Sequence, residues 1–448
     1  MKNLIVPALV AVALCGCELT PANWGFQAIK TMQTPADPPL KCGVALPADT
    51  QADSRAACTF KAGAKAADTV GVSAALGKDI PIKHVIIMMK ENRSFDHLFG
   101  KLHDQGQPET EGIPASFTNP DLTGAAIAPF HATTTCNPLD PGHQSASMRA
   151  VVNGGAMDGF VKNAANSSTR KGELAPSDGH YIMSTYEQTD LPFYYWLANT
   201  YALSDRHFAS IVGGTFANRN FYMFGQNAGV LDTGISYPDP ATNSIFRTLM
   251  TAGYTWGAYS DELPLSTTLG WTQSDPGVHS MQDLYDALDQ GTLPNVVFVD
   301  ANDSVTDDHP PGDLQAGEAW LRTLYQHAVG SPQWERLAII WTYDEGGGYP
   351  DHLAPPNGCA AVPGGPTELG VRIPLVAISP WARRHAVSHV VHDHTAITRF
   401  IEALFDLPAL TARDANAESL MDLFDFSCGR DLTPPSGAPE AATGGCTQ

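Results

Sequence analysis

The sequence predicts an α/β protein in which helices cover both faces of a mainly parallel sheet. Short apolar or β-branched runs, bounded by polar, Gly or Pro positions, have the length of buried strands. They span 84–89, 201–203, 254–259, 296–299, 337–342 and 375–378. Helical segments lie between or after them, at 281–288, 317–328 and 395–405. Strands that alternate with helices are typical of an α/β/α sandwich.

The segment 395–405 shows the clearest helical pattern. Four apolar side chains recur along it at helical spacing and therefore share one face. They are Ile397, Phe400, Ile401 and Leu404. We expect an amphipathic helix in the last part of the folded region.

The composition fits a globular protein and argues against a nucleic-acid binder. Among the 448 residues, 43% are hydrophobic and 16% are charged, which is typical of a globular chain. Lys and Arg total 26 and Asp and Glu total 47, so the formal net charge is −21. Affinity for nucleic acid comes mostly from Lys and Arg that neutralise phosphates. A phosphorylated substrate is compatible with this charge, because a bound cation can reverse the local field.

The N-terminus has the features of an export signal. Residues 1–17 read MKNLIVPALVAVALCGC, with one Lys before an apolar run that is too short to span a bilayer. This pattern predicts a signal peptide. The sequence Leu14-Cys15-Gly16-Cys17 resembles a bacterial lipobox, in which Cys17 would be lipidated and attach the protein to a membrane. Ordinary cleavage nearby is the alternative. We expect an exported protein of the periplasm or cell envelope, or a secreted one if no lipid is attached.

Three regions follow the signal peptide. Residues 18–80 are rich in Ala, Pro, Asp and Gly and show no sustained period, so we expect a tether and a loosely structured lead-in. Residues 81–432 contain the predicted strands and form the main domain. Residues 433–448 are rich in Pro, Gly and Ala and are expected to be an irregular tail.

Six cysteines remain after the signal peptide. An even number in an exported protein suggests up to three disulfides. The sequence spacing favours two local loops, Cys42–Cys58 and Cys428–Cys446, and leaves Cys136–Cys359 as a long-range link. None of these cysteines has a CxxC spacing typical of zinc or redox sites.

Polar side chains lie where ligand sites occur in open α/β sheets, at the carboxyl ends of strands. Glu91 and Asn92 follow the first predicted strand, and Asp344 and Glu345 follow the fifth. Thr215 follows a Gly-Gly turn, at which the backbone can approach a ligand closely. Each group alone could be a helix cap or a solvated turn. Together they can supply an all-oxygen cation site.

Five blocks carry a resemblance to a known family. They are ENRSFDHLFG, GGTFANRN, DDHPP, TYDEGGGYPDH and HDHTAITRFIEALFDLPALTARDA, in this order between about residues 81 and 426. They resemble the signature blocks of the bacterial phosphoesterase family, which contains phosphatidylcholine-hydrolysing phospholipases C and acid phosphatases within the alkaline phosphatase superfamily. The resemblance implies an alkaline-phosphatase-like catalytic domain over 81–432 and hydrolysis of phosphoric esters.

The resemblance also implies roles for individual residues. Glu91, Asp344 and Glu345 match ligands of one divalent metal ion. Thr215 matches the nucleophile, whose oxygen also touches the metal, and Asn92 matches the residue that orients the phosphate. Metal coordination can activate a hydroxyl that is otherwise a poor nucleophile, and a phospho-threonine would then be hydrolysed by water. Oxygen ligands favour Mg, Mn or Ca, whereas nearby histidines leave room for Zn.

Histidines are expected around this site. His309, in the DDHPP block, matches a family position and could donate to phosphate or protonate the leaving oxygen. His352 follows the carboxylate pair through a glycine-rich turn and could reach the same pocket. His143 resembles a phosphate-facing histidine, and His131 competes for that role. His394 is expected to cap or brace the helix that follows it.

The leading hypothesis is an exported, metal-dependent phosphoric-ester hydrolase. Its substrate remains open between phosphomonoesters and phospholipids. The short chain without extra C-terminal β-domains favours an acid phosphatase, whereas export and a lipid anchor favour a phospholipase C. The alternative from another class is a non-catalytic, lipid-anchored protein that binds a phosphorylated ligand, and a hydroxyl at Thr215 argues against it. A sulfatase is less favoured because no cysteine occupies the local motif of that branch.

Overall fold

The computed structural model describes residues 34, 36–175, 177–232, 243–261, 277–302 and 305–447. The predicted signal peptide and Cys17 lie outside these residues. Within the described part of the chain, no helix is both long and apolar enough to cross a membrane.

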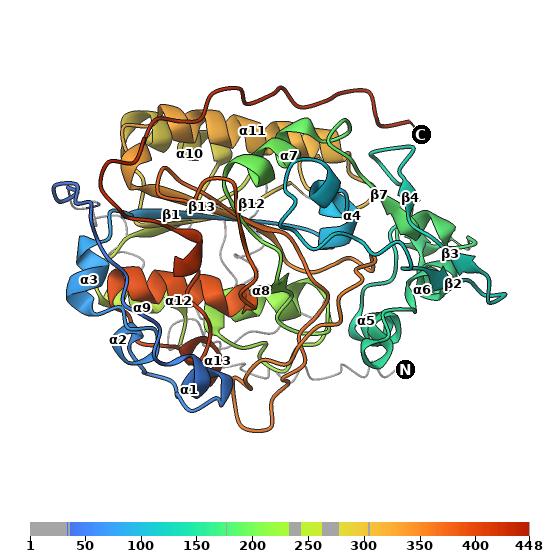
Figure 1. The fold of residues 1–448 in the computed structure, drawn as a ribbon, viewed down its shortest axis with the longest axis horizontal. Coiled ribbons are helices and arrows are strands. Elements are labelled where there is room, and N and C mark those ends of the chain that lie inside the picture. Colours follow the sequence, from blue (N-terminus) through green and yellow to red (C-terminus); the bar gives the residue numbers. More distant parts are fainter. Residues whose placement is uncertain are drawn as a thin grey trace, which may run out of the picture.

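An eight-stranded sheet runs through the centre of the molecule (Figure 1). Its order is β11-β10-β12-β1-β13-β14-β8-β15. Neighbours are parallel throughout except where β14 pairs with β13 and with β8. The prediction of a mainly parallel sheet is therefore confirmed. The strands are β1 (His84–Lys90), β8 (Ala202–Ser204), β10 (Trp256–Tyr259), β11 (Val278–His279), β12 (Val296–Asp300), β13 (Leu337–Tyr343), β14 (Leu375–Ile378) and β15 (Ala386–Ser388).

All six predicted strands belong to the eight-stranded sheet, and the two strands of that sheet that were not predicted, β11 and β15, lie at its edges. Every residue of β1, β12 and β13 is buried, because central parallel strands are covered on both faces. This burial explains their continuous apolar runs. The edge strands β11 and β15 have only two and three residues, and so short a segment carries no periodic signal.

Helices cover both faces of the sheet (Figure 1). One layer contains α7, α10 and α11, and the other contains α8, α9 and α12. The helices are α1 (Ala52–Ala56), α2 (Ala66–Thr69), α3 (Ala74–Asp79), α4 (Phe95–Phe99), α5 (Ser145–Val152), α6 (Phe160–Ser167), α7 (Pro192–Thr200), α8 (Thr215–Phe224), α9 (Ile245–Thr251), α10 (Met281–Gln290), α11 (Leu314–Gly330), α12 (His394–Phe405) and α13 (Ala412–Ala415). The α/β/α sandwich is thus confirmed.

Short paired strands lie outside the main sheet. They form the pairs β2-β3, β4-β7, β5-β6 and β9-β16. Their bounds are Asn119–Pro120, Ala126–Ile127, Phe130–His131, Ser184–Thr185, Thr169–Arg170, Glu173–Leu174, His207–Phe208 and His392–Asp393, in the order of those pairs. Most of them belong to residues 119–185, which include α5 and α6 and have a small hydrophobic cluster of their own. This part of the chain also contains His143.

Helix α12 is buried on every side. The four predicted apolar residues are at most 3% exposed, which confirms the predicted apolar face. All other residues of the helix are buried as well. Arg399 and Glu402 form an ion pair of 2.6 Å on this helix. A polar pair can be buried there because further chain covers the outer side of the helix.

The covering chain is the lead-in before residue 81. Helices α2 and α3 pack on α12, and Figure 1 shows α3 at one end of it. Arg399 donates to Ala64 O at 3.5 Å and to the Thr69 hydroxyl. Residues 36–80 are therefore not a loose tether, and the composition alone did not reveal these contacts.

The three disulfides connect other partners than the spacing predicted. They join Cys42 to Cys428, Cys58 to Cys359 and Cys136 to Cys446. The predicted number is confirmed, and all three predicted pairs are wrong. Each observed bond spans more than 300 residues, with separations of 386, 301 and 310. Sequence proximity failed as a guide because both ends of the chain return to pack on the central domain.

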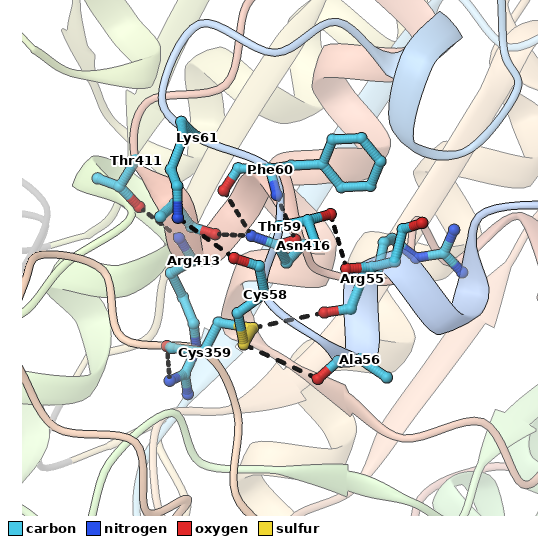
Figure 2. The surroundings of a disulfide bond; sticks show 12 residues. Arg55, Ala56, Cys58, Thr59, Phe60, Lys61, Cys359, Thr411, Arg413 and Asn416 are labelled. Carbon is cyan, nitrogen blue, oxygen red and sulfur yellow. Dashed lines mark hydrogen bonds between the residues drawn. A yellow bond between two sulfur atoms is a disulfide. The ribbon is translucent and has the colours of Figure 1, made fainter.

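Figure 2 shows how the lead-in is held at the Cys58–Cys359 disulfide. Arg413 donates to Cys359 O at 2.6 Å. The side chain of Asn416 accepts from Phe60 N at 3.0 Å and donates to Phe60 O at 2.9 Å. The disulfide therefore joins a well-anchored part of the lead-in to the long loop after β13.

The C-terminal segment runs along α11 (Figure 1). Its described residues, 433–447, contain no helix or strand. Arg322 of α11 donates to Pro439 O at 2.7 Å, and Gly445 N donates to Gln315 Oε1 at 2.9 Å. The segment is irregular but attached to the domain.

We predict that removing the Cys58–Cys359 disulfide with the double substitution Cys58→Ser and Cys359→Ser lowers the free energy of unfolding by about 2–5 kcal/mol, because the bond restricts the unfolded chain. Denaturation in guanidinium chloride measures the change. An unchanged unfolding midpoint, or non-reduced peptides that link Cys42 to Cys58, would contradict the assignment.

Candidate active site

Three neighbouring strands deliver acidic residues to one edge of the sheet. Strand β1 is followed by Glu91, β13 is followed by Asp344 and Glu345, and β12 ends with Asp300. The three strands are parallel neighbours, so their carboxyl ends meet. The backbone also joins two of the ends, because Asp344 N donates to Lys90 O at 3.0 Å.

The side chain of Asn92 lies at the centre of this group. One terminal atom of its amide is 2.9 Å from Glu345 Oε1 and 3.1 Å from Asp344 Oδ1. The other terminal atom is 3.0 Å from His309 Nε2. With its nitrogen toward the carboxylates, the amide donates to both of them. With its oxygen there, three oxygens converge in the way that suits a hard divalent cation.

A glycine permits the close contact between the two loops of this site. A β-carbon at Gly347 would lie 2.5 Å from Asn92 O and 2.6 Å from Asn92 Cβ, which is sterically forbidden. The φ of Gly347 is also +60°, a region that glycine adopts readily. Its N–H donates to Glu345 Oε2 at 2.7 Å. The glycine-rich sequence after Glu345 is therefore a requirement for packing around Asn92.

Two histidines direct their Nε2 atoms toward Asn92. His143 Nδ1 lies 2.8 Å from Pro141 O and His309 Nδ1 lies 2.6 Å from Pro310 O. Each Nδ1 therefore carries a hydrogen and donates it, which leaves Nε2 for the site. His143 Nε2 is 3.4 Å from the Asn92 amide and 4.0 Å from Glu345 Oε1. The structure thus brings two of the predicted histidines, His143 and His309, to Asn92 beside the predicted carboxylates.

Burial and like charge shift the ionisation of this group. Burial, reinforced by Asp344, raises the pKa of Glu345 to about 8, although His143 opposes the shift. Burial works against protonation of His143, but Glu345 and Asp140 outweigh it and raise the pKa of His143 to about 10. The carboxylates repel one another and attract positive charge, which is the property expected of a cation site.

A buried arginine that the sequence analysis did not single out contacts three of the carboxylates. Arg219 forms ion pairs with Asp300, with Asp344 at 3.3 Å and with Glu91 at 3.3 Å. Although burial disfavours its charge, Asp300 and the other two carboxylates hold the pKa of Arg219 well above its usual value. The strand-end rule that pointed to Asp344 applies equally to Asp300, so that residue could have been found.

Thr215 is the first residue of α8 and lies one turn before Arg219 on the same side of the helix. It is 6% exposed. The turn before it is held by Asn218, which accepts from Ile211 N at 3.1 Å and donates to Gly213 O at 3.0 Å. The N-terminus of a helix attracts anions through its unpaired N–H groups and its dipole. A phosphate beside Thr215 would benefit from both.

The loop that carries His309 is fixed by the two aspartates before it. Asp307 accepts from Glu91 N at 2.7 Å. Asp308 forms a fully buried ion pair with Lys90 at 2.7 Å and accepts from the Tyr343 hydroxyl. Burial raises the pKa of Asp307 to about 6, although Lys90 opposes the shift. The DDHPP block therefore supplies two anchoring residues as well as a histidine.

His352 is not among the residues that surround Asn92. Its Nδ1 lies 2.7 Å from Asp96 Oδ2, and Arg372 joins Asp96 at 2.8 Å and Asp351 at 3.0 Å. This is a separate, buried ionic network. The chain after Glu345 turns so that His352 joins that network. The short sequence distance from Glu345 had led us to expect His352 beside Asn92 instead.

The two remaining candidate histidines have structural positions. His131 is exposed and pairs with Asp190 at 2.8 Å. His394 lies between the Ser210 hydroxyl, at 3.1 Å from Nδ1, and Tyr343 O, at 2.9 Å from Nε2. His394 therefore braces the start of α12 against the end of β13, as predicted, and His143 rather than His131 occupies the site.

Asn92 lies between Asp344 and Glu345, and Arg219 pairs with both Asp344 and Glu91. The oxygens of these carboxylates are of the kind that suits Mg, Mn or Ca, but the three residues are not among the described groups whose ligand atoms all lie within 4.8 Å of one another. Two other groups meet that distance: Asp140 with His143 and His309, and Asp96 with Asp351 and His352. Arg372 already supplies positive charge to the last group.

An acidic cluster with two histidines at the carboxyl ends of parallel strands has the groups that phosphoester hydrolysis requires. The chain belongs to the phosphoesterase family, whose model matches residues 82–408. The protein is therefore a hydrolase that acts on phosphoric esters.

The curated relatives include several phospholipases C. Phospholipase C B of Mycobacterium tuberculosis is 29% identical over 425 residues, with 79% of this chain and 80% of the relative covered. Non-specific phospholipase C1 of Arabidopsis thaliana is 29% identical over 410 residues, with 80% and 74% covered. Among solved structures, an alkaline phosphatase superfamily protein of Vibrio parahaemolyticus matches with a TM-score of 0.36 and 11% identity over 72% of this chain and 78% of that one.

We predict that Arg219→Ala lowers the free energy of unfolding of the metal-free protein by about 3–5 kcal/mol, because it leaves three buried carboxylates without their counter-charge. Urea denaturation in the presence of a chelator measures this. Arg206→Ala is the matched control, since Arg206 forms a half-exposed pair with Glu111 and its loss should cost at most about 1 kcal/mol. Equal effects of the two substitutions would disprove the role of Arg219.

Proposed function

We propose that the protein is an exported, metal-dependent enzyme that hydrolyses phosphoric esters through a covalent phospho-threonine at Thr215. The observation that carries this proposal is the convergence on Asn92 of Asp344, Glu345 and His309. Arg219 connects one of these carboxylates, Asp344, to the helix that begins with Thr215.

One divalent cation would be held by Glu91, Asn92, Asp344 and Glu345, with the Thr215 oxygen beside it. The cation supplies positive charge that lowers the pKa of the threonine hydroxyl and neutralises the nonbridging phosphate oxygens. The residues present fit such an ion, because the Asn92 amide oxygen can join two carboxylate oxygens at about the spacing of neighbouring ligands.

The chain itself orients the substrate and moves the protons. The N-terminus of α8 directs N–H groups toward a phosphate beside Thr215. The Thr215 hydroxyl would give its proton to a carboxylate of the site as its oxygen forms a bond to phosphorus and the bond to the leaving oxygen breaks. His309 Nε2 would donate the proton that the leaving oxygen needs. Water then attacks the phospho-threonine, and free phosphate or a phosphorylated head group leaves. His143 Nε2 is placed to donate to a phosphate oxygen.

Phospholipids are the favoured substrates. The two curated relatives described above match this chain over 80% and 74% of their own length, and both carry the name phospholipase C. A lipid anchor at Cys17 would keep the enzyme at a membrane. Three disulfides are typical of proteins outside the reducing cytosol. Phosphomonoesters are the second candidate, because the same groups would attack either substrate.

A non-catalytic phospholigand-binding protein is disfavoured by the position of Thr215. Binding alone needs donors and positive charge, which the helix N-terminus, the cation and the histidines supply. A hydroxyl at the first residue of the helix that carries Arg219 adds a nucleophile that a binder does not need. Binding of phosphorylated ligands without any turnover would favour this alternative.

We predict that Thr215→Ala reduces kcat by roughly three orders of magnitude or more, because no other group can form the covalent intermediate. Rates on p-nitrophenyl phosphorylcholine and on p-nitrophenyl phosphate measure the loss. Thr215→Ser is the matched control, since it retains the hydroxyl and should retain most of the activity. A Thr215→Ala enzyme as fast as the parent would exclude the phospho-threonine.

We also predict that Glu91→Ala and Asp344→Ala lower the metal content of the purified protein together with its rate. Elemental analysis after dialysis measures the bound metal, and the same measurement identifies the ion. Glu368→Ala is the control, because Glu368 is exposed and pairs only with Arg149 among the described ion pairs. Unchanged metal content in both site variants would rule out the proposed ligands.

A further inference from the structure

A second cavity lies at the opposite end of the strands that form the active site. It has a volume of about 400 Å³, within the range of small-molecule sites. Lys83, Asn295 and Arg336 line it, and these residues directly precede β1, β12 and β13. Glu91 and Asp344 follow the other ends of two of these strands. The cavity is therefore separated from the active site by the length of the sheet.

Cationic side chains exceed acidic ones around this cavity. Four cationic and two acidic residues line it: Lys41, Lys78, Lys83, Arg336, Asp37 and Asp79. The local excess of positive charge contrasts with the formal charge of −21 on the whole chain. Neither acidic residue neutralises the pocket fully, because Asp79 pairs with the exposed Lys41 and Asp37 is shared between His84 at 3.2 Å and Arg336 at 3.5 Å.

Lys83 is the cation best placed to bind a ligand. Its Nζ donates to Lys78 O and to Ile80 O, both at 2.7 Å. An ammonium has three hydrogens, so one donor remains for another partner. Burial, reinforced by Arg336, lowers the pKa of Lys83 to about 8, and Asp37 opposes the shift. An anion bound in the cavity would stabilise the protonated form of Lys83 and oppose the lowering of its pKa.

The inner wall of the cavity is apolar. Ile80, Leu404 and Phe405 line it but are at most 4% exposed, so its accessible apolar surface comes from the exposed Pro38 and Pro39 and the half-buried Tyr254. The ring of Tyr254 packs against that of Phe405, with centroids 4.6 Å apart. Apolar surface of this kind gains free energy when a hydrocarbon group displaces water from it. A purely polar anion would leave this wall in contact with water.

We propose that this cavity binds an anion that carries an apolar group, such as a fatty carboxylate or an alkyl phosphate. The cations that line it would hold the head group, and the apolar surface of Pro38, Pro39 and Tyr254 would contact the hydrocarbon. This site goes beyond the hydrolytic function and does not depend on the identity of the substrate.

Octanesulfonate is a suitable probe because it combines the two features and cannot be hydrolysed as a phosphoester. Isothermal titration of the full chain, with a chelator present, should show binding of octanesulfonate. Methanesulfonate, which lacks the tail, and 1-octanol, which lacks the charge, should each bind at least about tenfold more weakly, because each forgoes one part of the site.

Two substitutions test the location of the site. Lys83→Gln should weaken octanesulfonate binding roughly tenfold, because it removes a charge-assisted hydrogen bond, and Lys83→Arg should retain most of it. Lys78→Gln, at an exposed position, should also weaken binding and cannot disturb the core. Lys61→Gln is the control, because this lysine is exposed and lies outside the cavity lining.

Three results would overturn the proposal. The first is an absence of octanesulfonate binding to the parent protein at millimolar concentration. The second is equal binding by the Lys83→Gln and Lys78→Gln variants and the parent. The third is weaker binding in Glu91→Ala with no effect of Lys83→Gln, which would locate the probe in the active site. None of these results bears on the phospho-threonine, so the two proposals can fail independently.

Discussion

The assembly of the proposed active site depends on the ion pairs between Arg219 and the carboxylates that surround it. Three parallel strands end side by side, and each brings a carboxylate into a space from which water is excluded. Such groups repel one another, and only nearby positive charge makes their burial tolerable. Arg219 contacts Asp300, Asp344 and Glu91 from a single guanidinium. The rest of the proposed site can assemble because this charge balance exists before any metal arrives.

The same interaction determines where the proposed nucleophile lies. Arg219 belongs to α8, so its ion pairs hold the first turn of that helix against the sheet, and Thr215 is in that turn. A second buried pair, Lys90 with Asp308, anchors the loop of His309 to the end of β1. Two ionic contacts thus bring together a helix, a loop and three strand ends that are distant in the sequence.

The sequence predicted the parts of this arrangement that follow from local pattern. Continuous apolar runs located the central strands, and the rule that ligand groups follow strands identified Glu91, Asn92, Asp344 and Glu345. That rule also covers Asp300, which was overlooked. The role of Arg219 depends on three partners from separate strands, so no local pattern reveals it. The predictions of the disulfide pairs and of a loose lead-in were wrong for a related reason. Both the disulfides and the cover of α12 depend on how the two ends of the chain pack on the domain.

The disulfides place a demand on biosynthesis. In the proposed export, the N-terminus would enter the oxidising compartment first, and Cys42 and Cys58 would arrive long before Cys428 and Cys359. Early oxidation would therefore join the first two cysteines, which are only 16 positions apart in the sequence, and produce a non-native bond. Native pairing requires either that the domain folds before its thiols are oxidised or that an isomerase exchanges the early bonds. Production of active protein thus depends on the redox machinery of the host as much as on the intrinsic stability of the fold.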